Sequence, residues 1–493
     1  MSTGEIREYL ESLDVCAICV LRYKNVSFQD FSNVLKDLEN EATELNTVKR
    51  QRFNTCIACL DIFQSVNSVA QELINHSKLR DYECSSLYTS IQIPIALLLR
   101  ELSLWMALIE KFPGKIDENI PPNISIKDVF KHLFNKKLCE TTNRTLEQNQ
   151  NGILVNVFYD FDMDHEETEK LLGVRPLSFQ ANCGESRKNS KNMRAITRNF
   201  FEKNFFPKNL NFDDYKKQIP VPPKTSSVPI KFARYSIDGP TVWVAGRYRK
   251  LSRDLSQTPW IIGGKRMKED SIQELISREI CPYFSIDLTE HSEQCIFISS
   301  GREDIDVRML GQGRPFVLQI AGAKRSSLPA EVAREMQSRV DNSKQVSVQH
   351  LQLVKREDLV HIKTGEEQKK KLYRALCVLK VPVTSDTMKK LDISTGFMIQ
   401  QQTPLRVLHR RPLLNRPREI FNVKGYILKD QQKGIVLDIT TGAGTYIKEF
   451  IHGDFGRTSP SISSIIGQDI DIVALDVNAI DLQWPPEISN TFN

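Results

Sequence analysis

The sequence contains few cysteines and no long apolar stretch that is free of charge. Its ten cysteines are spread over 493 residues, which excludes the dense disulfide framework of a small secreted domain. The most apolar stretch, residues 91–109, includes Pro94, Arg100 and Glu101, and the first eight residues have no apolar core. Neither a membrane-spanning helix nor a signal peptide is therefore predicted. We expect a soluble intracellular protein, located in the nucleus, the cytoplasm or both, without membrane association.

The chain also lacks a strong excess of one charge. Its formal net charge is +6, so a polyanionic partner would have to bind local clusters of cations. Its length exceeds one ordinary core, because a domain usually holds about 100 to 200 residues. The proline-rich segment 219–229 cannot join a helix or a central strand, and it marks the main boundary. We predict three domains, formed by residues 1–64, 65–229 and 230–493.

Four of the cysteines form two Cys-x-x-Cys pairs, Cys16 with Cys19 and Cys56 with Cys59. Each pair can place two thiolates on one tetrahedral metal ion, and 36 residues separate the pairs. We expect one structural zinc ion, because four protein ligands leave no open position for a catalytic water. The alternative is that all four are buried core cysteines. A thioredoxin-like redox role is disfavoured, since neither pair follows a strand of a βαβ pattern.

The amino-terminal half outside the cysteine pairs holds mainly helical patterns. Residues 28–52 have apolar side chains at helical spacing and predict an amphipathic helix. Helical patterns continue over residues 65–134, with a buried helix at 91–109, whereas residues 153–159 form a strand pattern. Residues 187–201 mix cations with asparagines and aromatics, a combination that suits phosphate contacts and base stacking. The alternative for this segment is a solvated helix face. Its candidate phosphate-binding cations are Arg187, Lys188, Lys191 and Arg194.

The carboxy-terminal part alternates short strands with helical patterns, which places it in a mixed α/β (α+β) class. The predicted strands are residues 241–245, 316–320 and 436–439, and the predicted helices are residues 271–280 and 329–340. Two clusters in this part, residues 246–250 and 409–412, are predicted to form basic patches.

Acids and arginines gather in the segment 301–308, directly after the apolar strand pattern of residues 295–300. A turn at the end of such a strand can lift a side chain into a cleft. A carboxylate beside guanidinium groups is expected to remain ionised and available as a nucleophile, because a nearby positive charge favours the charged form. The alternative is an ordinary charged turn that is stabilised by its own ion pairs.

Two tyrosines of the same part lie beside cations. Tyr373 follows Lys371 at the start of a short apolar run, where its ring could stack on a base. Tyr446 lies in the glycine turn 442–450, which follows a strand pattern and opens a helix. The alternative for each tyrosine is a half-buried core position. This turn also resembles the nucleotide-binding loop of a methyltransferase, but only 49 residues follow Gly444, too few for the strand–helix units of that fold.

Together, three of these stretches resemble the motifs of the pseudouridine synthases, and they occur in the same order. Arg302-Glu303-Asp304 resembles the Arg-x-Asp motif, Lys371-Leu372-Tyr373 the base-stacking tyrosine motif, and residues 444–448 the third motif. The wider signature is similar to that of Pus-ten, a tRNA pseudouridine synthase family of archaea and eukaryotes. This signature comprises residues 301–308, 311–316, 408–412 and 444–450. The similarity covers residues 242–486 and extends to the two cysteine pairs, which that family carries beside a THUMP-type RNA-binding module.

The resemblance implies a pseudouridine synthase fold with a mixed β-sheet and a catalytic cleft in residues 230–493. It implies a THUMP-like RNA-binding region in residues 65–229, beside the zinc-binding residues 1–64. The implied activity is isomerisation of uridine to pseudouridine in the T loop of tRNA, at position 54, position 55 or both. The base would be flipped out of its stack, and no organic cofactor would be needed. We expect a monomer whose partner is the T arm of tRNA, with no protein partner indicated.

For the site, the resemblance implies that Asp304 is the nucleophile and that Tyr373 stacks on the flipped-out uracil. Lys448 would pair with Asp304, while Tyr446 and Arg302 would contact the substrate. Lys448 stands where several related families have arginine, so a bidentate pairing with the nucleophile is not expected.

Two alternatives remain open at this point. Asp306 could replace Asp304 as the nucleophile, because two residues along a strand would put both carboxylates on one face. The motif spacing Arg302-x-Asp304 favours Asp304. The protein could instead be a non-catalytic RNA-binding protein that acts as a tRNA folding or maturation factor.

Overall fold

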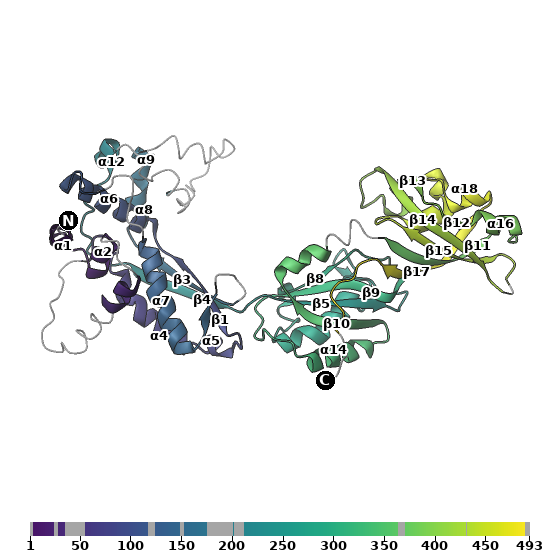
Figure 1. Cartoon of the computed structure of the whole chain (residues 1–493), viewed down its shortest axis with the longest axis horizontal. Coiled ribbons are helices and arrows are strands. Elements are labelled where there is room, and N and C mark those ends of the chain that lie inside the picture. The colour runs from purple at the N-terminus through teal and green to yellow at the C-terminus, as the bar shows by residue number, and fades with distance from the viewer. Residues whose placement is uncertain are drawn as a thin grey trace. The chain divides into compact units, whose positions relative to one another are not determined.

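The computed structural model describes residues 3–23, 28–34, 55–116, 124–147, 152–174, 201, 212–362, 370–429 and 431–488. The chain divides into two compact units, residues 1–239 and 240–493 (Figure 1). The boundary lies ten residues beyond the predicted end at 229, because strand β4 (Lys231–Asp238) pairs antiparallel with β3 (Ile153–Asp160) in the first unit. The cysteine pairs share one hydrophobic core with the residues that follow them, so residues 1–64 are not a separate domain.

The first unit contains a four-stranded sheet in the order β2-β1-β3-β4, in which β1 and β3 run parallel. Helices α4 and α7 pack against each other, and α7 also packs against β1 (Figure 1). The other elements of this unit are α1 (Thr3–Ser12), α2 (Ala17–Arg22), η1 (Ile62–Ser65), α4 (Val66–Asn75), α5 (Ser77–Asp81), β1 (Ser86–Gln92), α6 (Ile95–Lys111), α7 (Ile126–Thr142), β2 (Thr145–Leu146), α8 (Asp164–Glu169), α9 (Leu171–Val174) and α12 (Phe212–Gln218).

The predicted buried helix at residues 91–109 corresponds to α6, which begins after Pro94 and is buried along most of its length. The helical pattern assigned to residues 65–134 overlooked strand β1. In β1 the side chains of Leu87, Thr89 and Ile91 are buried in alternation, which is the period of a strand. Among the residues described, no helix is long and apolar enough to cross a membrane.

Two other predictions for the first unit fall wholly or partly outside the described ranges. Residues 28–34 of the predicted amphipathic helix are helical, with Phe31 fully buried, and the rest of that segment is not described. The basic segment also lies outside the described residues. Its four candidate phosphate-binding cations are Arg187, Lys188, Lys191 and Arg194.

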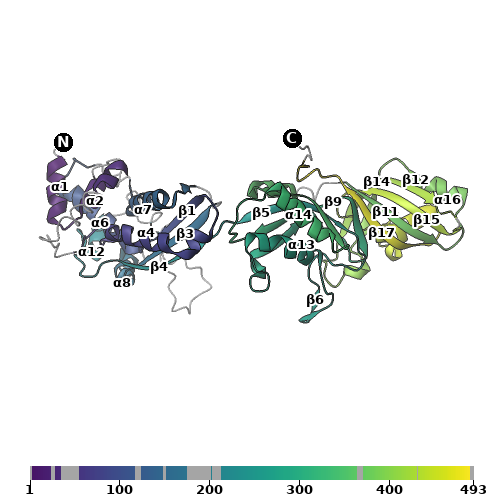
Figure 2. The same cartoon turned by 90° about the horizontal axis from the view of Figure 1, so that it is seen from below.

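The second unit is built on an eleven-stranded sheet in which nine strands follow the order β10-β5-β9-β17-β11-β15-β14-β13-β16. Strand β8 pairs with β9, and β12 pairs with β14. Neighbouring strands are antiparallel except β9 and β17, which run parallel, so the predicted mixed α/β class is confirmed. Helices α13 and α14 pack together (Figure 2), and both also contact β10. The strands are β5 (Val242–Lys250), β6 (Ile261–Ile262), β7 (Lys265–Arg266), β8 (Cys295–Ser299), β9 (Val307–Ile320), β10 (Val346–Val354), β11 (Lys371–Leu379), β12 (Asp392–Ile393), β13 (Phe397–Gln402), β14 (Asn415–Ile427), β15 (Gly434–Thr441), β16 (Thr458–Ser459) and β17 (Ile470–Ile480).

The helices of this unit are short and connect or cover the strands. They are α13 (Ile272–Ile280), η3 (Cys281–Phe284), η4 (Ser292–Gln294), α14 (Ala330–Asp341), η5 (Arg356–Leu359), α16 (Ser385–Lys390), η6 (Leu405–Val407), α17 (Ile447–His452), η7 (Asp454–Gly456) and α18 (Ile462–Ile466). Strands β6 and β7 form a separate hairpin that projects from the unit, with Ile261 and Ile262 exposed (Figure 2). All three predicted strands and both predicted helices are present, and each strand is longer than expected.

The surroundings of β15 exclude the methyltransferase interpretation of the glycine turn. That fold needs a parallel, doubly wound sheet around the loop. Here β15 lies between β11 and β14, and it pairs antiparallel with both.

The predicted basic patch at residues 246–250 is wrong, because most of its side chains are buried within the sheet. Arg247, Tyr248 and Lys250 are almost inaccessible to solvent. The Arg247 guanidinium donates to the carbonyl oxygens of Gln312, Gly313, Leu482 and Trp484. Burial lowers the pKa of Arg247 to about 10. This cation therefore holds a bend of β9 to the segment after β17 and is not available for RNA.

Two glycines allow the bend in β9 to approach its neighbours closely. Gly311 has φ +58°, and a Cβ atom placed there would lie 1.9 Å from the carbonyl oxygen of Asn478 in β17. Gly313 has φ +74°, and a Cβ atom there would lie 2.6 Å from the carbonyl oxygen of Tyr248 in β5. The glycines at 311 and 313 are thus required by close backbone contacts on both sides of β9.

We predict that Gly311→Ala lowers the free energy of unfolding of the second unit by about 3 kcal/mol, because the new methyl group forces β17 away. Urea unfolding followed by tryptophan fluorescence measures this, since three of the four tryptophans lie in that unit. Gly263→Ala is the matched control: its φ is +55°, but nothing lies within 4 Å. It should lose only about 1 kcal/mol of backbone strain. Equal losses in the two variants would contradict the steric explanation.

Candidate active site

The acidic segment between β8 and β9 is a loop and not a continuation of a strand. Gly301 has φ +85°, and residues 301–306 have no strand pairing. The Lys250 ammonium, which is 1% exposed, donates to the carbonyl oxygens of Asp304 (3.0 Å), Ile305 (2.6 Å) and Val307 (2.9 Å). Burial lowers the pKa of Lys250 to about 8, so at neutral pH it is still protonated and can donate all three hydrogen bonds.

A buried ion pair holds the same loop from its other side. Arg314 in β9 contacts Glu303 through Nε–Oε2 (2.9 Å), and its Nη1 donates to the carbonyl oxygen of Ser300 (2.7 Å). The Tyr248 hydroxyl donates to Glu303 Oε1 (2.9 Å), and Gln257 donates to the carbonyl oxygen of Gly301 (3.0 Å). Glu303 therefore points into the protein, which leaves its neighbour Asp304 facing the opposite way.

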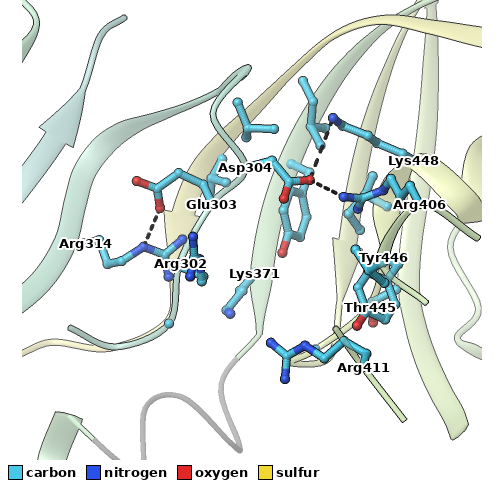
Figure 3. A pocket seen from close by; sticks show the side chains of 18 of the residues that line it. Arg302, Glu303, Asp304, Arg314, Lys371, Arg406, Arg411, Thr445, Tyr446 and Lys448 are labelled. Carbon is cyan, nitrogen blue, oxygen red and sulfur yellow. Dashed lines mark hydrogen bonds and ion pairs between the residues drawn. The ribbon is translucent and has the colours of Figure 1, made fainter. Parts of the chain in front are cut away.

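Asp304 faces a cleft of about 420 Å³ that is lined by residues from five separate stretches of the second unit (Figure 3). All the substrate and catalytic residues predicted from the sequence line it: Arg302, Asp304, Tyr373, Tyr446 and Lys448. The strands β11 and β17 and the turn before α17 contribute its walls. Residues that are far apart in the chain are thus brought together in one place.

The cations next to Asp304 differ from the sequence prediction. Asp304 Oδ2 lies 2.8 Å from Arg406 Nη1 and 3.7 Å from Lys448 Nζ (Figure 3). The predicted pairing of Lys448 with Asp304 is therefore present but longer than the contact with Arg406. Lys448 Nζ is closer to Asp306, at 2.6 Å and 2.8 Å from its two carboxylate oxygens.

Asp306, the alternative nucleophile, does not share a strand face with Asp304. Both acids precede β9, so the argument from two residues along a strand does not apply. Burial raises the pKa of Asp306, but the hydrogen bonds and charge of Lys448 outweigh it and hold the pKa below its usual value. Asp306 does not line the 420 Å³ cleft. It lines a second hollow, which Asp304 and Lys448 also line, together with Trp260, the residue directly before β6.

The two tyrosines occupy different positions in the cleft. Tyr373 in β11 is largely buried, and its burial raises its pKa to about 12, so its hydroxyl stays protonated. Tyr446 is half-buried and precedes α17, where its backbone N–H donates to Gln401 Oε1 and its carbonyl oxygen accepts from Gln401 Nε2. The Arg406 guanidinium lies 5.9 Å from the Tyr446 ring. Both tyrosines line the same cleft.

Arg406 is the residue that the sequence prediction missed. It lies in the loop between β13 and β14, and its Nε donates to Glu449 Oε1 at 2.6 Å. Glu449 is buried in α17, directly after Lys448. A buried carboxylate thus orients the guanidinium that contacts Asp304. Only the tertiary fold brings this loop to the cleft, and no local pattern in the sequence distinguishes Arg406 from other surface arginines.

The lining of the cleft carries more cations than acids. The cations are Arg302, Arg314, Lys371, Arg406, Arg410, Arg411 and Lys448, and the acids are Glu303 and Asp304. Arg410 and Arg411 belong to the basic cluster predicted at residues 409–412, and both are exposed. The cleft and its rim are therefore suited to a phosphate-bearing substrate.

The four cysteines predicted to bind metal are close together in the first unit. The sulfur atoms of Cys16, Cys19, Cys56 and Cys59 all lie within 4.8 Å of one another, with Cys16 and Cys59 3.7 Å apart. Zinc with four sulfur ligands at about 2.3 Å requires sulfur atoms about 3.8 Å apart. The backbone N–H groups of Cys16 and Cys19 also donate to sulfur atoms of the group. The donor set and its spacing fit a zinc ion.

Each of the two units is similar to part of a known protein family. A family model described as Pus10, C-terminal matches residues 243–481, and one described as Eukaryotic Pus10, N-terminal matches residues 56–234. The putative tRNA pseudouridine synthase Pus10 of Drosophila melanogaster is 42% identical over 509 residues, which cover 100% of this chain and 99% of that protein.

Two further relatives extend the comparison. The tRNA pseudouridine synthase Pus10 of Homo sapiens is 34% identical over 450 residues, covering 90% of this chain and 81% of that protein. The enzyme of the same name from Pyrococcus furiosus is 37% identical over 237 residues, covering 48% of this chain and 56% of that protein. The chain therefore belongs to the Pus10 family of tRNA pseudouridine synthases.

Proposed function

We propose that the protein isomerises uridine to pseudouridine in the T loop of tRNA, at position 54, position 55 or both, with Asp304 as the nucleophile. One observation carries the proposal: a single cleft gathers Arg302, Asp304, Tyr373, Tyr446 and Lys448, which the sequence had suggested from three separate motifs. The curated relatives, named as tRNA pseudouridine synthases, support the class of reaction and substrate.

The reaction requires a uridine that has left its stack. Flipping costs roughly a few kcal/mol, which stacking on an aromatic ring and backbone contacts to cations can offset. In this proposal Tyr373 stacks on the uracil, while Tyr446 and Arg302 line its site. The glycosidic bond from carbon 1′ to N1 breaks with the help of Asp304. The uracil then turns and bonds to carbon 1′ through carbon 5, which loses its proton as N1 gains one.

Asp304 suits the nucleophilic role better than Asp306 on geometric grounds. Asp304 lines the cleft with both tyrosines, whereas Asp306 points to Lys448 from the neighbouring hollow. Arg406 and Lys448 hold Asp304 from two directions and fix the orientation of its carboxylate. In this proposal the side chains of the cleft carry out catalysis. The isomerisation has no net redox change that would require an organic cofactor.

The first unit would support the enzyme without taking part in its chemistry. We propose that Cys16, Cys19, Cys56 and Cys59 hold one zinc ion, which joins α2 to the turn before η1. Four protein ligands leave the ion no open position, so its contribution is to the stability of the fold. The THUMP-like RNA-binding role of this unit and the monomeric state remain predictions from the sequence.

The decisive experiment is incubation of the purified protein with unmodified tRNA transcript, followed by mapping of pseudouridine at single-nucleotide resolution. Pseudouridine at position 54, 55 or both supports the proposal. Tight, salt-sensitive binding of the tRNA without any modified product would instead support a non-catalytic RNA-binding protein, since the exposed cations of the rim would bind RNA in either case.

We predict that Asp304→Asn abolishes pseudouridine formation, because the amide is nearly isosteric but is a poor nucleophile. Loss of a covalent catalyst should remove most of a rate enhancement that is at least about a millionfold in typical enzymes. Binding of tRNA should change little, because it rests on many phosphate contacts. Single-turnover assays and a binding titration separate the two effects.

Asp306→Asn is the matched control for this experiment. It removes a charge from the same loop and from the same lysine, but Asp306 itself does not line the cleft. We expect it to retain turnover. If Asp306→Asn is inactive and Asp304→Asn active, the nucleophile is assigned to the wrong carboxylate.

We predict that the double variant Arg410→Gln/Arg411→Gln weakens tRNA binding and lowers the slope of log affinity against log salt. Each lost phosphate contact should reduce that slope by about 0.7 to 0.9. Lys389→Gln/Lys390→Gln removes the same charge from α16, which does not line the cleft. Salt titrations of binding should show an unchanged slope for this control, and equal effects would indicate a non-specific charge effect only.

We predict one zinc ion per chain, and a lower melting temperature of the first unit after chelation. Metal analysis of protein purified without a chelator measures the zinc content. Thermal melts with and without a chelator measure the change in melting temperature. Cys59→Ser should lose the metal, whereas Cys139→Ser should keep it, because Cys139 lies outside the four-cysteine group. A metal-free native protein, or an unchanged melt after chelation, would disprove the zinc site.

A further inference from the structure

The turn after α17 has a backbone conformation that is rare outside glycine. Four successive residues have positive φ: Gly453 (89°), Asp454 (47°), Phe455 (56°) and Gly456 (87°). Non-glycine residues persist in this region only when their surroundings fix them, and such strain concentrates at functional sites. The Phe455 side chain is 94% exposed, more than any other large apolar side chain in the described ranges.

Hydrogen bonds on both sides of Phe455 fix this turn. The backbone N–H of Leu405 donates to Asp454 Oδ2 (3.1 Å), and Asp454 N–H donates to His452 Nδ1 (3.0 Å). Arg457 donates to the carbonyl oxygen of Thr403 (2.6 Å). The backbone is thus held by its neighbours, while the phenyl ring itself projects into solvent. Packing of the protein does not explain an aromatic residue at this position.

The same hydrogen bonds join the turn to the lining of the cleft. Leu405, which binds Asp454, directly precedes Arg406, the closest cation to Asp304. Gln401 bonds both to Tyr446 and to the hydroxyl of Thr458, which follows the turn. Helix α17, whose six residues rise about 9 Å, separates Lys448 at its start from the turn at its end. Phe455 itself does not line the cleft, but hydrogen bonds fix its turn to two segments that carry or position lining residues of the cleft.

The chemistry around Phe455 identifies the kind of group it would contact. The loop that the turn supports carries the exposed cations Arg410 and Arg411, which suit phosphates. The nearest acids on the same elements, Asp454 and Glu449, are buried and engaged in hydrogen bonds or ion pairs. An exposed aromatic ring whose turn is bonded to a loop with exposed cations is a combination suited to unpaired bases, which stack on the ring while the cations contact the backbone.

We propose that Phe455 is a stacking site for a second, unpaired nucleobase of the RNA, outside the cleft that receives the reacting uracil. The ring has no hydrogen-bonding group, so it accepts any base and contributes affinity and register without reading sequence. This inference rests on the proposed function for the identity of the RNA, a tRNA loop. It concerns RNA binding outside the cleft and assigns no part in the chemical step to Phe455.

The test compares three substitutions at one exposed position. With unmodified tRNA transcript, Phe455→Ala should raise Kd and KM by about tenfold, the scale of one lost base stack, and leave the single-turnover rate at saturating RNA within about threefold. Phe455→Trp should bind as tightly as the wild type. Phe455→Leu should resemble Phe455→Ala, because it keeps an apolar side chain but loses the planar ring. Ile427→Ala is the control, since Ile427 is also exposed, at 60%, and does not line the cleft.

A direct readout uses the fluorescence of Phe455→Trp. Stacking of a base on the new indole should quench its emission when tRNA is added, beyond the change seen in the wild type. Wild-type Kd and KM in Phe455→Ala, together with no extra quenching in Phe455→Trp, would overturn the proposal. So would retention of affinity in Phe455→Leu, which would indicate a simple apolar contact.

The remaining outcomes separate this inference from the proposed function. If the wild type forms no pseudouridine but Phe455→Ala still weakens tRNA binding, the stacking site stands and the catalytic proposal fails. If Phe455→Ala changes only the sedimentation of the protein, from a dimer to a monomer, the ring contacts a second protein chain and the RNA stacking site is disproved.

Discussion

A buried ion pair between Glu303 and Arg314 fixes the loop on which the rest of the site depends. The pair lies next to Asp304, and Arg314 also binds the carbonyl oxygen of Ser300. Removing one partner of such a pair costs about 3 to 5 kcal/mol, but two apolar side chains of similar size could be equally stable. The pair instead fixes the orientation of the loop. Because Glu303 is held inward and Lys250 binds three carbonyl oxygens, the backbone at Asp304 has one orientation.

The second constraint is the sharing of cations between acids around the cleft. Lys448 contacts both Asp304 and Asp306, and Arg406 contacts both Asp304 and Glu449. A lysine ammonium is a compact charge whose donors can rotate, so it can lie between two carboxylates. An arginine guanidinium has donors fixed in one plane, which suits the bidentate binding of a single carboxylate. Lysine in the third motif is therefore consistent with a loop that carries two acids. The planar guanidinium comes instead from Arg406.

The sequence predicted the members of the site better than their contacts. Residues 304, 373, 446 and 448 were identified because each lies in a local motif, and the fold brings all of them to one cleft. Arg406 was missed because its role depends on a loop far away in sequence. Arg247 and Lys250 were assigned to the surface because a charged residue in a strand is usually exposed. These two cations are buried because they donate hydrogen bonds to carbonyl oxygens of segments that are distant in the sequence.

The same distinction applies to the fold. The strands within residues 241–245, 316–320 and 436–439 and the helices within 271–280 and 329–340 have clear local periods, and the structure contains them. The domain boundary was misplaced because β4 follows the proline-rich segment but pairs with β3, a strand that precedes that segment. Strand pairing across about seventy residues leaves no local signal.

The contacts of Asp304 also distinguish its two oxygen atoms. Both Arg406 and Lys448 approach Oδ2, and among the residues described no hydrogen bond or ion pair reaches Oδ1. A nucleophile must be fixed in position and must also keep a lone pair free for the bond that it forms. Holding one oxygen with two cations while leaving the other open meets both requirements. For Asp304 acting as a nucleophile, Oδ1 is therefore the atom that would attack, and the cations on Oδ2 would set its direction.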